Sequence, residues 1–257
     1  AFVAEDFHIN PKENNFCHQE IGGQIQEINQ AGSEDCLYLD IRAPHGSRDN
    51  LPVMFWIHGG GNTSGHKDFY NFSELVKRKD VIVVSPNYRL GPLGFFTHPA
   101  IQDYHSGIDK TSNFGILDIV LALKWVNENI ASFGGDPNNI TIFGESAGGH
   151  NVLSLLVAQQ AKGLFHKAIS QSGYTKSSSL QNAYKSENFN EEGISDSWTV
   201  LNKISVDKKL ASDLSEANTF QLKSHKEVLR KILYETNAQE LVNLYGDTFE
   251  TPLLTND

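Results

Sequence analysis

Several features that mark particular classes of protein are scarce in this chain of 257 residues. The longest apolar runs, such as Val53–Ile57, are far too short to cross a bilayer. No basic-then-apolar leader opens the sequence, so no signal peptide is predicted. Basic residues are outnumbered, with 21 Lys and Arg against 31 Asp and Glu, and the net charge is −10. That balance disfavours nucleic acid or an anionic membrane surface as the main partner.

Cysteine is also scarce, since the chain contains only Cys17 and Cys36. Two interpretations stay open at this point. The residues are either two buried thiols or a disulfide that closes a loop of about twenty residues, which would stabilise the fold by ~3 kcal/mol. The spacing alone does not decide between them.

The composition is that of an ordinary globular protein, with 39% hydrophobic and 20% charged residues. The length suffices for one large domain with a sizeable core. Predicted strands alternate with predicted helices, which indicates an α/β fold with right-handed crossovers and a mostly parallel sheet. In such sheets the functional site lies beyond the carboxyl ends of the strands. The predicted strands are Leu37–Ile41, Val53–Ile57, Val81–Ser85, Ile140–Phe143 and Ala168–Gln171, and the predicted helices are 71–79, 113–130 and 152–157.

The most informative motif is G-x-S-x-G at Gly144 to Gly148. It stands between the predicted buried strand Ile140–Phe143 and the predicted helix 152–157, which is the setting of a nucleophile elbow. We expect Ser146 in a strained backbone conformation with its hydroxyl exposed, and we expect side chains at the two flanking glycines to collide with neighbouring chain. The alternative is a chance glycine-rich turn, which the flanking strand and helix disfavour.

A second glycine motif, His58-Gly-Gly-Gly61, directly follows another predicted buried strand. Backbone amides can approach a ligand closely there, because no side chain stands in the way. This is the H-G-G-G oxyanion motif of lipases and esterases. A flexible glycine loop is the alternative.

Beyond Thr175 the composition becomes polar. Ser224 and Glu227 are spaced as a capping box, and apolar residues at helical spacing follow them. We therefore predict a helical insertion packed beside the sheet.

Several segments together resemble one family, the type-B carboxylesterase/cholinesterase family of α/β-hydrolases. The resemblance covers roughly Cys17 to Gly173 and implies an α/β-hydrolase fold that is incomplete at both termini. The matching segments are Ser33–Leu39, Trp56–Gly61, Asn87–Gly91, Asn113–Asp118, Trp125–Gly149 and Ser170–Gly173.

The resemblance implies roles for individual residues. Ser146 matches the nucleophile that attacks an ester carbonyl and forms an acyl-enzyme. The amides of Gly60, Gly61 and Ala147 match the oxyanion hole, which stabilises the charge of the tetrahedral intermediate. No metal and no organic cofactor is implied, and the partner is a small-molecule ester.

Structural residues are implied as well. Cys17 and Cys36 match the family's first disulfide, which implies an oxidising compartment and hence a secreted or periplasmic protein. Arg89 and Asp118 match a structural ion pair. Glu145 matches the acidic residue beside the nucleophile, which we interpret as buried support.

The family's catalytic acid and histidine lie well downstream of the nucleophile, so we expect both to fall after Asp257. The segment Pro252–Asp257 resembles one that precedes the acid, and the family's opening strands are absent before Ala1. The sequence is therefore interpreted as a fragment of one α/β-hydrolase domain. In it, residues 1–174 form the N-terminal part of the catalytic core and residues 175–257 form the helical insertion.

No histidine within the chain is a good candidate for the missing base. His150 lies on the elbow helix, and we expect its ring to point away from Ser146. His58 is assigned to the oxyanion loop. His98, Asp103 and His105 suggest a metal site only weakly, because loop histidines at loose spacing are usually solvated.

Two departures bear on the substrate. The loop from Cys17 to Cys36 contains no tryptophan, which argues against a choline-ester specialist. Asn62 replaces the aromatic residue usual after the third glycine, so we expect an altered pocket wall. Asn62 also begins one of three N-x-S/T sequons, with Asn71 and Asn139, and lies too close to the oxyanion loop to favour glycosylation.

The leading hypothesis is a serine carboxylesterase acting on uncharged esters. The alternatives are a cholinesterase-like binding or adhesion domain without catalysis and an inactive truncated product. The sequence leaves the oligomeric state open.

Overall fold

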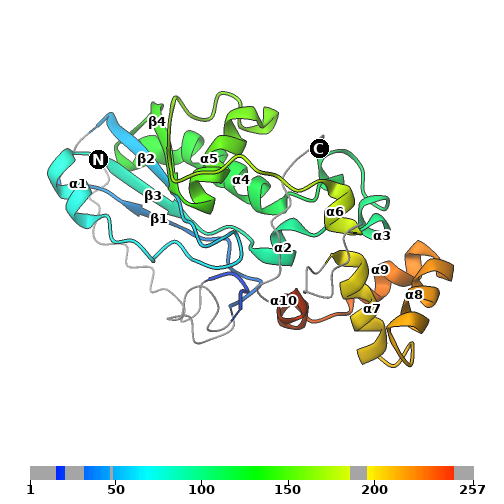
Figure 1. Ribbon diagram of the computed structural model, residues 1–257. Coiled ribbons are helices and arrows are strands. Elements are labelled where there is room, and N and C mark those ends of the chain that lie inside the picture. Colours follow the sequence, from blue (N-terminus) through cyan, green and yellow to red (C-terminus); the bar gives the residue numbers. More distant parts are fainter. Residues whose placement is uncertain (1–15, 21–31, 47–48, 186–195, 246–257) are drawn as a thin grey trace.

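The computed structural model describes residues 16–20, 32–46, 49–185 and 196–245, and its centre is one five-stranded sheet (Figure 1). The strand order is β1-β3-β2-β4-β5. The strands β2, β3, β4 and β5 run parallel, and β1 pairs antiparallel with β3 at one edge. The bounds are β1 (Leu39–Arg42), β2 (Leu51–Ile57), β3 (Ile82–Pro86), β4 (Gly135–Glu145) and β5 (Lys167–Gln171). The predicted α/β class with a mostly parallel sheet is confirmed.

The two faces of the sheet are covered differently. On one face, Phe55 of β2 lies opposite Val84 of β3 and Ile142 of β4, and all three are fully buried. The helices α4 (Phe114–Asn129) and α5 (Ala147–Val157) cover this face and supply apolar side chains to its core. On the other face, Trp56 and Phe143 pack with a smaller group that includes α1 (Ser73–Lys79).

The longest helix, α4, is continued by a short 3-10 turn, η2 (Ile130–Phe133). Further 3-10 turns are η1 (Gly107–Lys110) and η3 (Gln159–Ala161). None of the helices in the described ranges is long and apolar enough to cross a membrane.

Strand β4 begins at Gly135, five residues before the predicted start at Ile140. The segment between them contains Asp136, Pro137 and two asparagines, which are poor strand formers. Leu51 of the neighbouring strand pairs with Gly135 and donates its amide to the Gly134 carbonyl at 2.9 Å. Pairing across the sheet therefore overrides the local preference of this segment.

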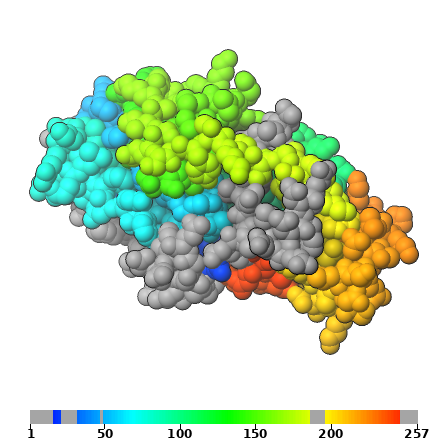
Figure 2. Space-filling view, viewed as in Figure 1, coloured from blue at the N-terminus to red at the C-terminus, as the bar shows by residue number. Residues whose placement is uncertain are grey.

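The helices after the sheet gather at one end of the molecule, where they form a separate lobe (Figures 1 and 2). They pack against the segment that contains α2 (Gly91–Phe95) and α3 (Pro99–Gln102), around a second apolar cluster that includes Ala100, Leu201 and Leu229. These helices are α6 (Leu180–Tyr184), α7 (Ser197–Asp207), α8 (Leu214–Lys223), α9 (Lys226–Tyr234) and α10 (Ala238–Tyr245). The segment Pro252–Asp257 lies outside the described residues.

The predicted capping box before α9 is wrong. The side chain of Ser224 donates its hydroxyl to the Phe220 carbonyl at 2.7 Å, at the end of the preceding helix α8. His225 is the N-cap residue of α9 and makes no side-chain cap bond. Because α9 begins at Lys226, Ser224 stands one residue before the N-cap position and is not placed to accept the amides of the first turn.

Candidate active site

Ser146 stands at the turn between β4 and α5, and its backbone is strained. Its φ of 55° and ψ of −121° lie in a region that residues with a side chain rarely adopt. The Ser146 amide donates to the carbonyl of Gln171, the last residue of β5, at 2.8 Å. The neighbouring strand therefore fixes the peptide group at the centre of the turn.

The glycines that flank Ser146 are required by the closeness of other backbone. A Cβ on Gly148 would lie 2.1 Å from the carbonyl oxygen of Ile57, and a Cβ on Gly144 would lie 2.6 Å from the backbone of Gly148. Neither neighbour can move aside easily, because Ile57 belongs to the central strand β2 and Gly148 to the first turn of α5. The expected collision at both glycines is confirmed, and so is the strained backbone at Ser146.

The glycine loop after β2 lies directly against the elbow. A Cβ on Gly59 would be 2.6 Å from the Glu145 carbonyl oxygen and 3.3 Å from the Cβ of Ser146. Within this loop, the Gly60 carbonyl accepts amides from Thr63 at 3.0 Å and Ser64 at 2.9 Å. The two glycine motifs, far apart in sequence, therefore form one site.

The carbonyl contacts of the loop determine where its amides point, because the C=O and N–H of one peptide group face in opposite directions. The Gly60 carbonyl faces the turn that it accepts from, so the amide of Gly61 faces away from that turn. The Gly59 carbonyl accepts from Nδ1 of His58 at 2.9 Å, which turns the amide of Gly60 away from the ring. Among the described residues, no hydrogen bond uses either amide.

The amide of Ala147 is a third available donor. Ala147 is the first residue of α5, and the first amides of a helix have no partner within it. The positive end of the helix dipole adds to the attraction for an anion. The site thus offers free amides on two segments, beside a serine hydroxyl that is partly exposed.

His58 is a structural residue of the oxyanion loop. Its ring is 2% exposed and stacks on Tyr88 at 4.3 Å between ring centroids. Burial lowers the pKa of His58 to about 4, so the ring is neutral near neutral pH and Nδ1 carries the proton that it donates.

Asn62 does not line the pocket, which corrects the expectation of an altered pocket wall. The residue is 0% exposed, and its side chain turns back to Asn151 of α5 and to Tyr88. The position of the Asn62 side chain also leaves its sequon inaccessible in the folded protein.

His150 points away from Ser146, as expected from its place on the elbow helix. Its Nδ1 is hydrogen-bonded to the carbonyl of Tyr174, and its ring stacks on the Tyr174 ring at 4.1 Å. Burial lowers the pKa of His150. Among the described residues, no histidine side chain is hydrogen-bonded to the Ser146 hydroxyl; His150 contacts Ser146 only through its backbone amide, which donates to the Ser146 carbonyl at 2.9 Å.

Glu145 is only partly buried, which corrects its interpretation as a buried support. Because side chains alternate along a strand, the carboxylate lies on the opposite face of the sheet from α4 and α5. There it lines an open cleft of about 450 Å³ together with aromatic side chains that include Trp56, Tyr70 and Phe143.

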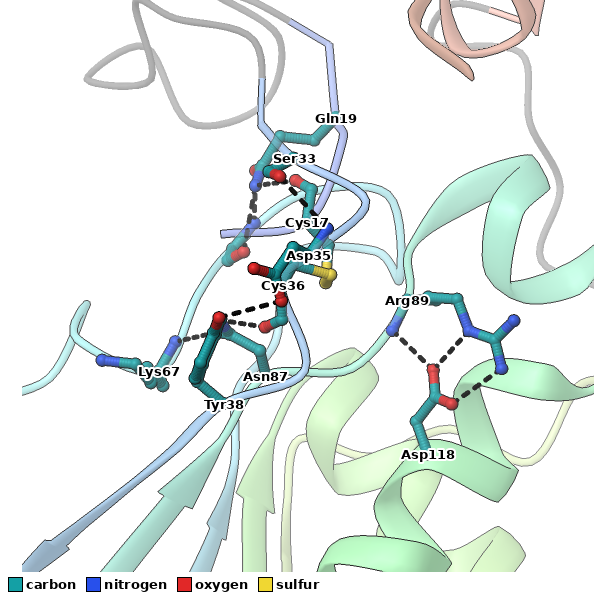
Figure 3. The surroundings of a disulfide bond; sticks show 11 residues. Cys17, Gln19, Ser33, Asp35, Cys36, Tyr38, Lys67, Asn87, Arg89 and Asp118 are labelled. Carbon is teal, nitrogen blue, oxygen red and sulfur yellow. Dashed lines mark hydrogen bonds and ion pairs between the residues drawn. A yellow bond between two sulfur atoms is a disulfide. The ribbon is translucent and has the colours of Figure 1, made fainter. Parts of the chain in front are cut away.

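Cys17 and Cys36 form a disulfide, the pairing that the resemblance implied (Figure 3). Next to the bond, the fully buried Gln19 contacts Gly65 twice: its Oε1 accepts the Gly65 amide at 2.8 Å, and its Nε2 donates to the Gly65 carbonyl at 3.2 Å. A Cβ on Gly65 would lie 2.5 Å from Nδ1 of His58. The disulfide region therefore packs through Gly65 onto the oxyanion loop.

Arg89 and Asp118 form an ion pair beside the disulfide region (Figure 3). The Arg89 guanidinium donates to both carboxylate oxygens at 2.8 Å, and the Arg89 amide donates to Oδ2 at 3.0 Å. The Asp118 side chain is only 5% exposed. The pair fixes the chain after β3 to α4.

The loosely spaced residues His98, Asp103 and His105 do not converge. His98 is buried against Gln221, Asp103 pairs with Lys226, and His105 contacts the Tyr234 hydroxyl. Within the described ranges, no group of three His, Cys, Asp or Glu side chains is arranged to hold a metal ion.

Comparison with known proteins gives a consistent result. A sequence model of the carboxylesterase family matches residues 10–247. The chain is 48% identical over 153 residues to a para-nitrobenzyl esterase of Bacillus subtilis, which covers 59% of this chain and 30% of that protein. It is 51% identical over 150 residues to liver carboxylesterase 1 of Oryctolagus cuniculus, covering 58% of this chain and 25% of the relative.

Solved structures agree with the sequence relatives. A structure titled PNB esterase superimposes with a TM-score of 0.63 at 35% identity, covering 90% of this chain and 41% of that one. A carboxylesterase of Geobacillus stearothermophilus gives a TM-score of 0.63 at 36% identity, covering 83% and 40%. The chain thus spans well under half the length of these relatives.

Proposed function

The chain belongs to the carboxylesterase family, and from that premise we propose that it carries the nucleophile and the oxyanion hole of a serine carboxylic-ester hydrolase. The observation that supports this best is the strained Ser146, held at the start of α5 beside free amides on two chain segments. Such an arrangement is suited to acyl transfer, because a nucleophilic hydroxyl stands next to backbone donors that can stabilise a developing charge.

In the proposed reaction, Ser146 Oγ attacks the ester carbonyl carbon as its proton passes to a general base. The carbonyl oxygen becomes an oxyanion, which accepts hydrogen bonds from the amides of Gly60, Gly61 and Ala147. The intermediate collapses, the alcohol leaves with the proton, and an acyl-enzyme remains on Ser146. Water then attacks the acyl-enzyme by the same route and releases the carboxylic acid.

Neither His58 nor His150 suits the role of general base, because His58 is enclosed by the oxyanion loop and His150 is bound to Tyr174. The base that we propose, and the acid that orients it, come from outside the described residues. The chain spans only 24 to 30% of the curated relatives, so the activity proposed is that of the complete protein.

The substrate class that we propose is uncharged small-molecule esters, handled without a metal or an organic cofactor. The absence of tryptophan between Cys17 and Cys36 supports an uncharged alcohol over choline. The disulfide supports residence in an oxidising compartment, so the protein is proposed to be secreted or periplasmic.

Replacing the nucleophile tests the proposal. In the complete protein, Ser146→Ala is expected to lower the turnover of p-nitrophenyl butyrate by roughly 10⁴-fold or more and to abolish labelling by an organophosphorus probe. The matched control is Ser205→Ala, which removes a buried helical hydroxyl that donates only to the Leu201 carbonyl. Unchanged turnover in Ser146→Ala would reject Ser146 as the nucleophile. A parent protein that neither turns over the ester nor is labelled by the probe would instead favour a binding domain without catalysis.

A further inference from the structure

Asn62 and Asn151 join the two chain segments that carry the proposed oxyanion donors. Asn62 directly follows Gly61, and Asn151 lies one helical turn after Ala147 in α5. Asn151 Nδ2 donates to Asn62 Oδ1 at 2.8 Å, and Asn62 Nδ2 donates to Asn151 Oδ1 at 3.2 Å. The two amides are therefore bound to each other in both directions.

Burial makes this pairing demanding. Both side chains are 0% exposed, so neither amide can turn to solvent if its partner is lost. A buried side-chain amide without a hydrogen-bond partner costs free energy. The two amides satisfy each other only when the two chain segments keep this relative placement. The pair therefore restricts the separation between the loop after β2 and the start of α5.

Tyr88 attaches the same pair to the loop backbone. Its hydroxyl lies 2.7 Å from the His58 carbonyl oxygen and 3.2 Å from Asn62 Oδ1, so one proton is shared between two acceptors. Burial raises the pKa of Tyr88, which keeps that proton in place. The backbone carbonyl of Asn62 also accepts the Gly91 amide at 2.7 Å. Asn62 is thus held through both its side chain and its backbone.

The backbone of Asn62 gives a second reason for this anchoring. Its φ of 58° is left-handed, and it follows Gly60 at 102° and Gly61 at 63°. Three consecutive residues with positive φ are unusual, and asparagine tolerates this conformation better than most residues. Backbone hydrogen bonds from Thr63 and Ser64 to the Gly60 carbonyl close the turn, and the side-chain contacts of Asn62 connect it to α5.

We propose that Asn62 and Asn151 are positioning residues of the oxyanion hole, which hold the amides of Gly60 and Gly61 at a fixed distance from the amide of Ala147. The inference rests on the proposed function, because it assigns those amides to a reacting carbonyl. Neither asparagine touches substrate, since both are buried, and both act through the backbone beside them.

The expected effect follows from the cost of losing an oxyanion donor. Removing one donor outright lowers kcat by about 10²–10³-fold in a serine protease, and misplacing donors is a milder change. Loss of the pair is therefore expected to lower kcat by about 10–100-fold and to leave KM within about 3-fold, because the donors bind the transition state more strongly than the substrate.

The test compares Asn62→Gly, Asn151→Ala and the double variant in the complete protein. Glycine at residue 62 keeps the left-handed backbone available, so only the side-chain contacts are lost. The matched control is Asn202→Ala in α7, where a buried asparagine accepts from Gln221 Nε2 at 2.8 Å, outside the site. Each variant is assayed for kcat, KM and thermal stability, and for affinity toward a trifluoromethyl ketone, whose serine adduct places an oxyanion in the hole.

A positioning role predicts that the affinity for the ketone and kcat/KM fall by the same factor. The kcat of the double variant should be no lower than that of the more impaired single variant, because both substitutions break the same pair. Asn202→Ala should lose thermal stability only. Variants that lose stability but keep kcat and ketone affinity within about 2-fold of the parent would overturn the positioning role alone. A parent that neither turns over esters nor is labelled at Ser146 would overturn the proposed function, and the positioning role with it.

Discussion

One neutral histidine is buried beside the sheet and another where α3 meets the helical lobe, each inside a network of side-chain amides. Beside the sheet, His58 stacks on Tyr88, which contacts the Asn62–Asn151 pair. At the start of α3, His98 Nε2 is hydrogen-bonded to Gln221 Oε1 of the lobe, and Gln221 Nε2 donates to Asn202. The chemistry of the two networks is therefore alike.

The backbone around the two networks differs. Asn62, Ser146 and Ser172 have left-handed φ values, and each follows the carboxyl end of a sheet strand. In the described parts of the lobe, residues 180–185 and 196–245, only Lys209 among the non-glycine residues has a positive φ. The first network thus surrounds strained loops, whereas the second joins regular helices, so only the first is expected to affect catalysis.

The largest expected difference between the two regions is in how much one ion pair contributes to the free energy of unfolding. Arg89→Ala leaves the nearly buried Asp118 carboxylate without its guanidinium partner, and the free energy of unfolding is expected to fall by about 3–5 kcal/mol. Arg89→Lys keeps the charge but not the two parallel hydrogen bonds, so it should lose less. Urea denaturation of the three proteins measures the difference. A loss below about 1 kcal/mol for Arg89→Ala would show that the carboxylate finds other partners.

The two histidines should make stability depend on acid pH. Burial lowers the pKa of His58 and of His98 to about 4 each, whereas the unfolded chain titrates near the ordinary value of 6.5. Between these values the unfolded chain binds more protons, so stability is expected to fall as the pH drops from 6.5 to 4. Each histidine contributes about 3 kcal/mol to that loss.

A variant at His98, beside the lobe, separates the two contributions. His98 Nδ1 accepts the Ala100 amide at 3.1 Å and caps α3, a bond that asparagine can replace. His98→Asn should remove about half of the joint pH dependence of the two histidines without changing ester turnover. Denaturation midpoints across this pH range test it, and an unchanged slope would mean that His98 is not neutral through burial.

The smallest effect is expected at the contact between Asp103 and Lys226, which connects α9 to the segment after α3. Both side chains are well exposed, at 45% and 60%, so water and salt screen their attraction. Lys226→Ala should lower stability by less than about 1 kcal/mol, and 1 M salt should remove the difference. A loss as large as that of Arg89→Ala would contradict the contrast between the two regions.

Local sequence was sufficient to predict a structural feature where all the residues that form it lie in one short segment. The elbow was predictable because a strand, G-x-S-x-G and a helix are contiguous, and their steric demands come from the covalent chain. The sheet class followed from the alternation of apolar runs with helical patterns. Family resemblance, not spacing, gave the disulfide and the Arg89–Asp118 pair, because two distant residues carry no local sign of contact.

Only the tertiary structure decided which distant groups meet. The sequence predicted no role for Asn151 or for Tyr88, and Asn62 was expected in the pocket wall, yet packing of α5 against the glycine loop brings the three together. In the same way, pairing with β2 extended β4 through residues that disfavour strands, and the short link between α8 and α9 displaced a plausible capping box. Local preferences are worth about a kilocalorie per mole each, so packing and pairing across the molecule override them.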